Sequence, residues 1–482
     1  MTGWRKSKRW KAVQAADQQG RGVALRGVAW SVLLAALLWQ PGWARAEALQ
    51  VPSREYPTIG AALRQAPPGA RIAIAAGVYT EQLRVRRPVS LQPQPGAEGQ
   101  VIIQGGGQGR IMEIWAEDVQ VRGLRLQGSG ERVDPPDACL YAHKSARGLV
   151  VNGNDLSDCA FGIWVNGTPD VRIENNRVSG RKKPVFSDMG NGIHLWSVER
   201  ALVRGNRVHN VRDGIYISVS KDSAVLDNRM WKLRFGIHYM YNDDNRIEGN
   251  LTCNSMVGLA MMFSKRLSIL GNVAVNNQDH GMFFRSIFNS DITGNRAEEN
   301  ARGMVLNEAS FNTITENHVA GNATGVVVTG GSEDNQITGN NFMGNPLQVQ
   351  YTWRRPMYWD REGEGNYWGD YLGYDVNRDG RGDVRYFSAN RVDWLVNRYP
   401  QLKLLADSPL VRLMQGLESR FPVLRPAGVV DRAPFMQPHD KAASIPPGPE
   451  MDCGGILIKR NFSEDRRRGI TWCMAPEEGA AK

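Results

Sequence analysis

The amino-acid sequence predicts an all-β chain that winds into a right-handed parallel β-helix of about 22 residues per coil, followed by an irregular C-terminal extension. Three recurring residue types carry this prediction. An asparagine that follows a glycine, an acidic or an amide residue recurs at Asn154, Asn176, Asn206, Asn228, Asn250, Asn272, Asn295, Asn317 and Asn340. A glycine before an apolar residue recurs at Gly162, Gly192, Gly214, Gly236, Gly258, Gly281, Gly303 and Gly325. A single aliphatic residue recurs at Ile173, Val203, Leu226, Ile247, Ile269, Ile292, Ile314 and Ile337.

The asparagines are spaced by 22 or 23 residues, except for one step of 30, which indicates an eight-residue insert at 181–188. A unit of this length with three short strands and turns at glycine and asparagine is typical of a parallel β-helix. Leucine-rich repeats share the length but need a leucine pattern that this sequence does not have. At about 22 residues per coil, roughly 13 coils fit between residues 50 and 345. Each coil rises by about 4.8 Å, so the rod is on the order of 60 Å long. We expect the asparagines to stack as an internal amide ladder.

The N-terminal 46 residues are predicted to be a secretory signal peptide. A basic stretch precedes the apolar run at 27–39, and Ala44-Arg45-Ala46 provides small residues for cleavage before Glu47. The run is too short to span hydrocarbon comfortably, so we expect a soluble mature protein outside the cytoplasm. Of the net charge of +10, the leader carries eight basic residues and one acid, or +7, which leaves about +3 for the rest. Nucleic acid is therefore not an expected partner.

The remaining chain divides into three parts by its pattern. Residues 47–345 are predicted to form the β-helix, opened by a capping helix at 56–66 and by first strands at 70–74, 78–79 and 83–85. Residues 346–437 lose the period, are rich in aromatic residues and suggest short helices at 402–406 and 409–418. Residues 438–482 form a linker and a charged tail, for which we expect disorder. The five cysteines fit no disulfide scaffold: Cys139, Cys159 and Cys253 are expected as small buried side chains, while Cys453 and Cys473 are close enough in sequence to pair.

Strand alternation divides the residues after each marker glycine into core and surface columns. The first and third positions are almost wholly apolar and are predicted to be core. The second and fourth are predicted to face outward, and hold Trp164, His194, Tyr216, His238, Ala260, Phe283, Val305 and Val327, and Asn166, Trp196, Ser218, Met240, Met262, Arg285, Asn307 and Thr329. An outward stripe of aromatic, histidine and methionine side chains indicates a ligand or partner surface.

Four residues of this stripe are candidate copper ligands: His238, Met240, Met262 and His194. Imidazole and thioether together suit copper, particularly Cu(I). The two methionines lie on adjacent coils, and His238 shares a strand with Met240, so these three form the most compact set. The alternative is that the same residues form an apolar docking patch for another protein.

Two further patterns have a structural and a functional interpretation. Arg177, Arg207 and Arg229 fall on consecutive coils, where they are either balanced by neighbouring carboxylates and solvent or bind an acidic partner. Asp375, Asn377, Asp379 and Asp383 have the spacing of a calcium loop with glycine at its sixth position, but Tyr386 stands where the bidentate acid is expected. A loop rich in Asx turns explains the same residues.

Many β-helices cleave or epimerise polysaccharides, so a catalytic site is one possible function of this fold. The closest acid–base candidates are Asp243-Asp244 and Asp279-His280, and neither completes the set of clustered carboxylates, base and arginine that such a site needs. The sequence therefore predicts a protein that is not an enzyme. A secreted carbohydrate-active lyase, hydrolase or epimerase is the alternative, and an adhesin-like rod that binds glycans is a third.

The chain resembles the NosD family, periplasmic accessory proteins in the maturation of the denitrification enzyme nitrous oxide reductase. The resemblance covers about residues 50–437 and is strongest in Gly365-Asn366-Tyr367-Trp368-Gly369-Asp370-Tyr371. The sequences around Gly192–Trp196 and Gly236–Asp243 are also similar to the family. It implies a pectin-lyase-like solenoid that acts as a scaffold or carrier and requires no cofactor. The implied partners are the permease and ATPase of an inner-membrane ABC transporter, a copper chaperone and nitrous oxide reductase, whose copper–sulfide centre it helps to assemble at the periplasmic side of that membrane.

Overall fold

The computed structural model of the protein describes residues 48–181, 188–351, 355–388, 408–409, 413 and 428–439. The predicted signal peptide, the tail beyond residue 439, nearly all of both predicted C-terminal helices, Cys453 and Cys473 lie outside the described residues. No helix within the described part is long and apolar enough to cross a membrane.

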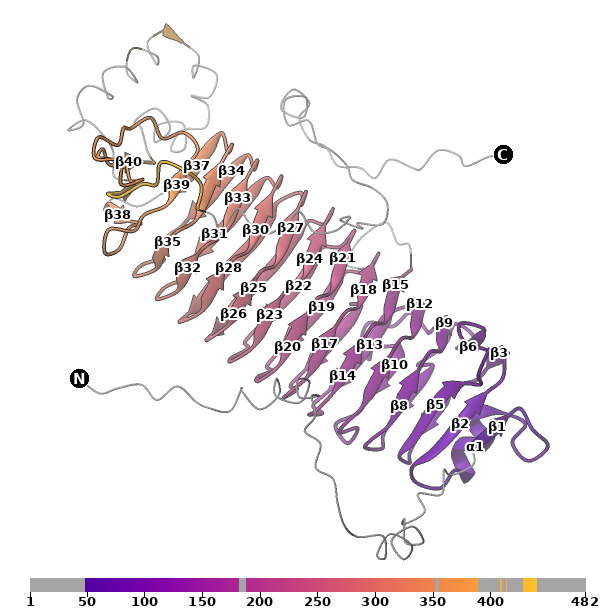
Figure 1. Ribbon diagram of the computed structural model, residues 1–482. Coiled ribbons are helices and arrows are strands. Elements are labelled where there is room, and N and C mark those ends of the chain that lie inside the picture. Colours follow the sequence, from indigo (N-terminus) through magenta and orange to yellow (C-terminus); the bar gives the residue numbers. More distant parts are fainter. Residues whose placement is uncertain are drawn as a thin grey trace, which may run out of the picture. The chain divides into compact units, whose positions relative to one another are not determined.

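The described strands wind into a solenoid with three long parallel sheets (Figure 1). Sheet A contains β1 (Leu49–Val51), β2 (Ala70–Ile74), β5 (Val89–Pro93), β8 (Gln120–Arg122), β11 (Val150–Asn152), β14 (Arg172–Glu174), β17 (Leu202–Arg204), β20 (Ala224–Leu226), β23 (Arg246–Glu248), β26 (Ser268–Leu270), β29 (Asp291–Thr293), β32 (Thr313–Thr315) and β35 (Gln336–Thr338). Sheet B contains β3 (Gly77–Thr80), β6 (Val101–Gln104), β9 (Arg125–Gln127), β12 (Asp155–Cys159), β15 (Arg177–Gly180), β18 (Arg207–His209), β21 (Arg229–Trp231), β24 (Leu251–Cys253), β27 (Val273–Val275), β30 (Arg296–Glu298), β33 (His318–Ala320), β36 (Asn341–Met343) and β39 (Tyr367–Trp368). Sheet C contains β4 (Leu83–Val85), β7 (Met112–Ile114), β10 (Ala138–Ala142), β13 (Phe161–Asn166), β16 (Ile193–Trp196), β19 (Asp213–Ser218), β22 (Phe235–Met240), β25 (Val257–Lys265), β28 (His280–Phe288), β31 (Arg302–Asn307), β34 (Thr324–Val328) and β37 (Leu347–Tyr351).

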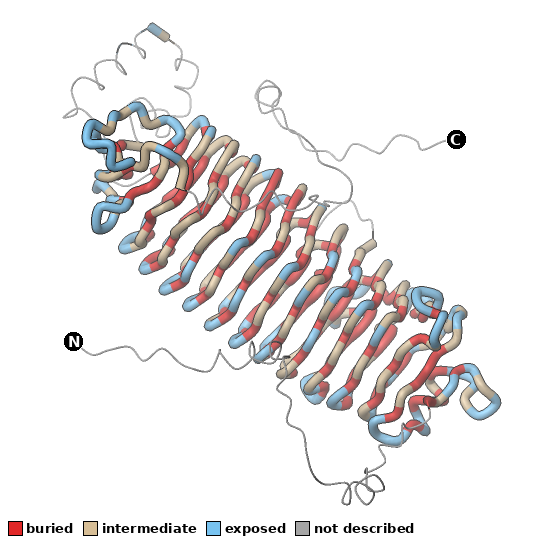
Figure 2. The backbone as a smooth tube through the Cα atoms, viewed as in Figure 1, coloured by how far each residue is buried: buried red, intermediate tan, exposed pale blue. Residues whose placement is uncertain are grey.

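The core is a set of inward columns that run the length of the solenoid (Figure 2). From β8 in sheet A and β9 in sheet B onward, each three-residue strand points its middle residue inward. Strands of sheet C such as β16, β19 and β22 point two residues inward, as the predicted first and third positions require. In one coil of sheet A the inward residue is Val225 and not Leu226, which the sequence pattern had selected. The parallel β-helix predicted from the period is confirmed.

The predicted asparagine ladder is present and continuous from Asn154 to Asn366. In a typical step the side-chain Oδ1 of Asn250 accepts hydrogen bonds from the backbone nitrogen of Asn228 at 3.0 Å and from its Nδ2 at 2.9 Å. The Nδ2 of Asn250 donates to the carbonyl oxygen of Val225 at 2.8 Å. Because each amide satisfies backbone groups that would otherwise be buried without a partner, the ladder stabilises the turn between sheets A and B.

The marker glycines have a steric cause. A Cβ atom on Gly236 would lie 2.6 Å from the carbonyl oxygen of Gly258 on the next coil, and one on Gly214 would lie 2.6 Å from that of Gly236. The chain approaches itself too closely at this corner for any side chain, which is why the glycine repeats with every coil.

The two ends of the solenoid are closed differently. Helix α1 (Ile59–Gln65) covers the N-terminal end, with Thr58 as its N-cap and Glu81 accepting hydrogen bonds from the backbone nitrogens of Ile59 and Gly60. At the other end the coils continue past the predicted boundary at residue 345, because β37 and β39 extend sheets C and B. A small sheet of β38 (Met357–Tyr358), β41 (Val429–Asp431) and β40 (Tyr386–Phe387) follows.

This C-terminal sheet is attached through buried aromatic and polar groups. Trp368 stacks on Tyr386 with ring centroids 4.1 Å apart. The Asp431 carboxylate accepts hydrogen bonds from the backbone nitrogen of Asn366 at 2.7 Å and from Nε1 of Trp368 at 2.9 Å. The last asparagine of the ladder is therefore joined directly to the C-terminal sheet.

Candidate functional site

The outward face of sheet C carries both predicted surface columns in the predicted register. Trp164, His194, Tyr216 and His238 are neighbours on successive strands, followed by Ala260. Ser218, Met240, Met262 and Arg285 are neighbours in the second column. The structure thus places the two methionines on adjacent strands and His238 two residues before Met240, as the sequence required.

The histidines are far less open than the sequence suggested. His194 and His238 are each only 7% exposed, whereas Trp196 in the neighbouring column is 45% exposed. The expectation that both histidines face solvent is wrong, because aromatic side chains on adjacent strands enclose them. The His194 ring stacks on Trp164 at 3.6 Å and contacts Tyr216 at 4.6 Å, and Tyr216 in turn contacts His238 at 4.9 Å.

His238 is oriented by a buried carboxylate. Its Nδ1 lies 3.1 Å from Oδ2 of Asp213, which is fully buried at the start of β19. Arg234 donates to both oxygens of the same carboxylate, at 2.8 and 2.6 Å. Burial raises the pKa of Asp213, but the hydrogen bonds from His238 and Arg234 outweigh that effect and leave the pKa below its usual value. The ionised carboxylate accepts the proton of Nδ1, so Nε2 of His238 keeps its lone pair for a ligand.

His194 has the opposite arrangement. Its Nδ1 lies 3.0 Å from Nδ2 of Asn191, whose Oδ1 accepts a hydrogen bond from Nε of Arg212 at 3.2 Å. An Nδ1 that accepts a hydrogen bond from an amide leaves the ring proton on Nε2. Burial lowers the pKa of His194 to about 3, so the ring is neutral at physiological pH. As arranged here, His194 offers a donor and not a lone pair from Nε2.

Sequence reasoning placed Tyr216 on this surface without a role and missed Asp213. Tyr216 separates the two histidines, and its hydroxyl lies 3.8 Å from Sδ of Met240 as a weak hydrogen bond. Asp213 holds His238, and its only signal in the sequence is its position directly before the marker glycine Gly214. We call His238, Met240, Met262, Asp213 and Tyr216 the His–Met cluster. His194 lies beyond Tyr216 and is not part of it.

No three His, Cys, Asp or Glu side chains in the described ranges converge on one point as metal ligands. The His–Met cluster would not meet that description, because two of its three candidate ligands are thioethers. Calcium at Asp375, Asn377, Asp379 and Asp383 remains a prediction. The observed oxygens of this loop accept backbone hydrogens: both oxygens of Asp375 bind the nitrogens of Asp379 and Gly380, at 3.2 and 2.8 Å. These bonds match the Asx-turn interpretation.

The arginine stripe lies on sheet B in the predicted register, with Arg177 beside Arg207 and Arg207 beside Arg229. The preceding residue of the column is Asp155, which pairs in register with Arg177 and makes a 3.7 Å ion pair with Arg125. A neighbouring carboxylate is thus available to the stripe, and its binding to an acidic partner remains a prediction.

Comparison with known proteins identifies the relatives of this solenoid. A family model described as "Periplasmic copper-binding protein (NosD)" matches residues 178–373, which include the His–Met cluster. The "Probable ABC transporter binding protein NosD" of Pseudomonas aeruginosa is 41% identical over 419 residues, covering 84% of this chain and 95% of that protein. The protein of the same name from Stutzerimonas stutzeri is 40% identical over 379 residues, covering 76% and 86%. The chain belongs to the NosD family.

Solved structures add the fold alone. The A-module of mannuronan C-5 epimerase AlgE6 from Azotobacter vinelandii superimposes with a TM-score of 0.50 at 14% identity, over 59% of this chain and 87% of that one. A pectin-lyase-like β-helix is therefore shown, whereas the epimerase activity belongs to that protein. The named NosD relatives are binding proteins.

The acid–base candidates Asp244 and Asp279 of this NosD chain are each bound by an arginine side chain. Asp244 accepts two hydrogen bonds from Arg266, at 2.6 and 2.7 Å, on an exposed turn. Asp279 binds Arg302 and lies 3.4 Å from Nδ1 of His280, at the other edge of sheet C. These carboxylates belong to separate ion pairs and do not face each other across a common site.

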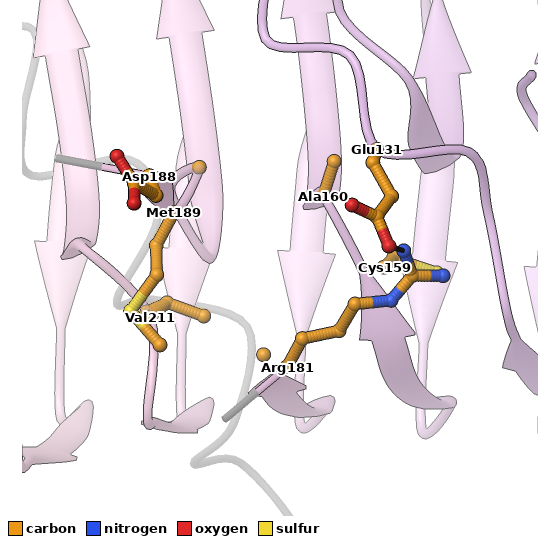
Figure 3. A pocket seen from close by; sticks show the side chains of 9 residues that line it. Glu131, Cys159, Ala160, Arg181, Asp188, Met189 and Val211 are labelled. Carbon is orange, nitrogen blue, oxygen red and sulfur yellow. Dashed lines mark hydrogen bonds and ion pairs between the residues drawn. The ribbon is translucent and has the colours of Figure 1, made fainter. Parts of the chain in front are cut away.

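Cys139, Cys159 and Cys253 are buried as expected, but the expectation that they are merely small apolar side chains is wrong, because all three are disulfide-bonded. Cys139 and Cys159 form a disulfide with a Cα–Cα distance of 5.7 Å, because the solenoid brings residues 20 apart into contact on neighbouring coils. A small cavity next to Cys159 is shown in Figure 3, lined also by Met189 and Val211. Arg181 extends below Cys159 to an ion pair with Glu131 at 2.9 Å. Its lining supports no separate site, because the Arg181 guanidinium is already held by Glu131 and Asp158.

Proposed function

We propose that the protein is a non-catalytic periplasmic carrier that receives copper and works with an inner-membrane ABC transporter to assemble the copper–sulfide centre of nitrous oxide reductase. The family description as periplasmic copper-binding supports copper as the cargo. The name of the relatives, ABC transporter binding protein, supports the transporter as a partner. The remaining partners of the proposal are a copper chaperone and the reductase.

One observation supports the His–Met cluster as the copper site above any other surface. A buried carboxylate holds Nδ1 of His238, which leaves Nε2 as the ligand atom, and the register places Met240 two residues further on the same strand with Met262 beside it on the next one. Carboxylate–histidine pairs of this kind fix the tautomer and orientation of metal-binding imidazoles. Soft thioether ligands favour Cu(I) over Zn²⁺ or hard cations.

The electrostatics suit reversible binding. An imidazole and two thioethers bind a metal as uncharged ligands, and the single negative charge of Asp213 is already balanced by Arg234. A bound Cu(I) would keep its full positive charge without a compensating anion in the site, which limits affinity. A carrier needs such a site, since a closed thiolate site would retain the metal.

The experiment is a Cu(I) titration against a chromophoric Cu(I) chelator under anaerobic conditions. Met240→Leu and Met262→Leu keep the apolar volume and remove sulfur, and we expect each to weaken Cu(I) binding by about tenfold or more. Met256→Leu is the matched control, because Met256 is an exposed methionine outside the cluster.

Asp213→Asn tests the orienting role separately. It keeps the shape of the side chain but offers Nδ1 of His238 a different partner, and loss of an outer ligand partner typically lowers metal affinity about 10–100-fold. Unchanged Cu(I) affinity in all three cluster variants, together with normal maturation of the reductase, would reject the copper site and leave a protein-docking surface.

A further inference from the structure

The outward face of sheet B is buried where nothing in the described chain covers it. On β24 and β27 the middle residues Thr252 and Ala274 point into the core, so Cys253 and Val275 point outward. Cys253 is nevertheless only 1% exposed and Val275 only 6%. They pack with the half-buried side chains of Trp231 and Leu251 in an apolar patch on this outer face.

A comparison of two identical sequence patterns supports a cover over this face. Arg246 and Glu248 form an outward Arg–x–Glu ion pair on β23 of sheet A, with side chains 50% and 36% exposed. Arg296 and Glu298 form the same pair on β30 of sheet B, with side chains 17% and 18% exposed. His318, on the neighbouring strand, lies 3.6 Å from Glu298 and accounts for part of this burial, whereas Arg246 lies between the small residues Ala224 and Ser268. A cover over sheet B explains the remainder.

The last described residues show where a cover begins. Residues 435–439 lie against the end of sheet B, where the backbone nitrogen of His439 donates to Oδ1 of Asn341 at 2.8 Å. Nδ2 of Asn341 donates back to the carbonyl oxygen of His439 at 3.2 Å. Asn341 is an outward residue of β36 and is fully buried. The chain thus reaches the outer face of sheet B with 43 residues still to follow, 440–482.

The cysteines identify the end of this path. Cys253 is disulfide-bonded. Cys139 and Cys159 are bonded to each other, and the chain has five cysteines, so the partner of Cys253 within this chain is Cys453 or Cys473. From β36 to β24 is four coils, about 19 Å at the strand spacing. The 14 residues from His439 to Cys453 span up to about 46 Å when extended, which is ample.

We propose that residues 440–458 lie along the outer face of sheet B from β36 to β24, and that a disulfide between Cys253 and Cys453 holds them there. The stretch before Cys453 contains Pro446, Pro447 and Pro449, which favour an extended chain without internal hydrogen bonds. Ile456, Leu457 and Ile458 follow it and provide apolar side chains for the patch around Trp231. The shorter loop to Cys453 costs less closure entropy than the loop to Cys473.

Forming this bond removes two electrons and two protons from the two thiols, which a protein disulfide donor of the exporting compartment accepts. The described disulfide between Cys139 and Cys159 already requires such an environment. The proposal does not depend on copper binding, since the His–Met cluster lies on sheet C.

Disulfide mapping of the full chain, exported and alkylated before unfolding, tests the pairing by mass spectrometry of non-reduced peptides. We expect Cys253 linked to Cys453 in the natural protein and in Cys473→Ser, with the link lost in Cys453→Ser. A Cys253–Cys473 link, a Cys453–Cys473 link with Cys253 alkylated, or a dimer joined through Cys253 would overturn the proposal.

Oxidative footprinting tests the cover itself. In a Cys453→Ser/Cys473→Ser double variant the tail cannot bond, and we expect oxidation of Trp231 to rise several-fold over Cys473→Ser alone. Trp164 on sheet C is the internal reference and should not change. Equal oxidation of Trp231 in both variants would show that the disulfide does not hold a cover on this face.

Discussion

Replacing one asparagine in the middle of the ladder should destabilise the solenoid far more than its size suggests. Asn250→Ala removes the acceptor of the backbone nitrogen of Asn228 and the donor to the carbonyl oxygen of Val225. The other three partners keep a bond. Nδ2 of Asn228 still reaches the oxygen of Val203, and Oδ1 of Asn272 still accepts from the backbone nitrogen of residue 250. The carbonyl oxygen of Glu248 loses the bond from Nδ2 of Asn250 but still accepts from the backbone nitrogen of Asp227. The backbone nitrogen of Asn228 is therefore left without a partner, whereas the carbonyl oxygen of Val225 keeps its place in the strand ladder of sheet A.

A buried group that loses its partner costs about 1–3 kcal/mol, so the expected loss is about 1–3 kcal/mol. The matched control is Glu248→Ala on the same coil, which breaks an exposed ion pair with Arg246 and should cost at most about 1 kcal/mol. Repeat proteins do not always unfold in one step, so a local measurement is better than a global midpoint.

The assay is native-state hydrogen exchange at the amide of Asn228. Because 1.4 kcal/mol is a factor of ten, a loss of 2 kcal/mol lowers its protection by about 25-fold. We expect this decrease in Asn250→Ala, centred on the coils of β20 to β26, and no comparable change in Glu248→Ala. Equal protection in both variants would refute the argument that the amide ladder satisfies otherwise orphaned backbone groups.

Three other predictions concern the ends of the chain. N-terminal sequencing of exported protein should begin near Glu47, and recovery of residues 30–40 in the membrane fraction would contradict a cleaved signal peptide. Truncation at about residue 395 should leave a folded solenoid by circular dichroism that no longer copurifies with the transporter permease, and continued copurification would place the docking surface elsewhere. Burial raises the pKa of Asp431 to about 6, above the unfolded value of about 3.9. A raised pKa stabilises the fold below the unfolded value and loses that contribution as pH rises through 6, so exchange of β41 amides, corrected for intrinsic rates, should quicken between pH 4 and 7. Asp431→Asn should remove this pH dependence, and a persistent dependence would assign it to another group.

Most of the fold was predictable because the same structural position needs the same residue type in every coil, so the sequence of a solenoid repeats with the length of one coil. The residues before the ladder asparagines, such as Gly205, Asp227 and Gly249, have φ values of 64, 55 and 64°. Only glycine, asparagine and aspartate adopt this left-handed conformation readily, which explains the mixed residue types at that position. The end of the solenoid was harder, because Asn366 follows Asn340 after 26 residues and lies outside the regular period.

The candidate site was predictable in its columns but not in its contacts. Register placed His238, Met240 and Met262 together, since the repeat fixes which residues are neighbours on adjacent strands. The register did not show that Asp213, the first residue of the neighbouring strand β19, hydrogen-bonds His238 on β22. The disulfide between Cys139 and Cys159 was missed because these cysteines lie 20 residues apart, a separation that looks scattered in sequence and is one coil in space.

The number of stacked coils fixes the distance between the closed C-terminal end and any given strand of the solenoid. From β22, which carries His238 and Met240, to β37 is five strand steps in sheet C, or about 24 Å. If the C-terminal end rests on a membrane partner, the face that carries the proposed copper site stands at a set height above it, because the coils between the two are stacked strand on strand. Deleting one coil of 22 residues between β28 and β34 would lower that height by about 4.8 Å while leaving both ends intact. Evolution can therefore adjust the reach of such a protein in discrete steps, by gaining or losing whole coils.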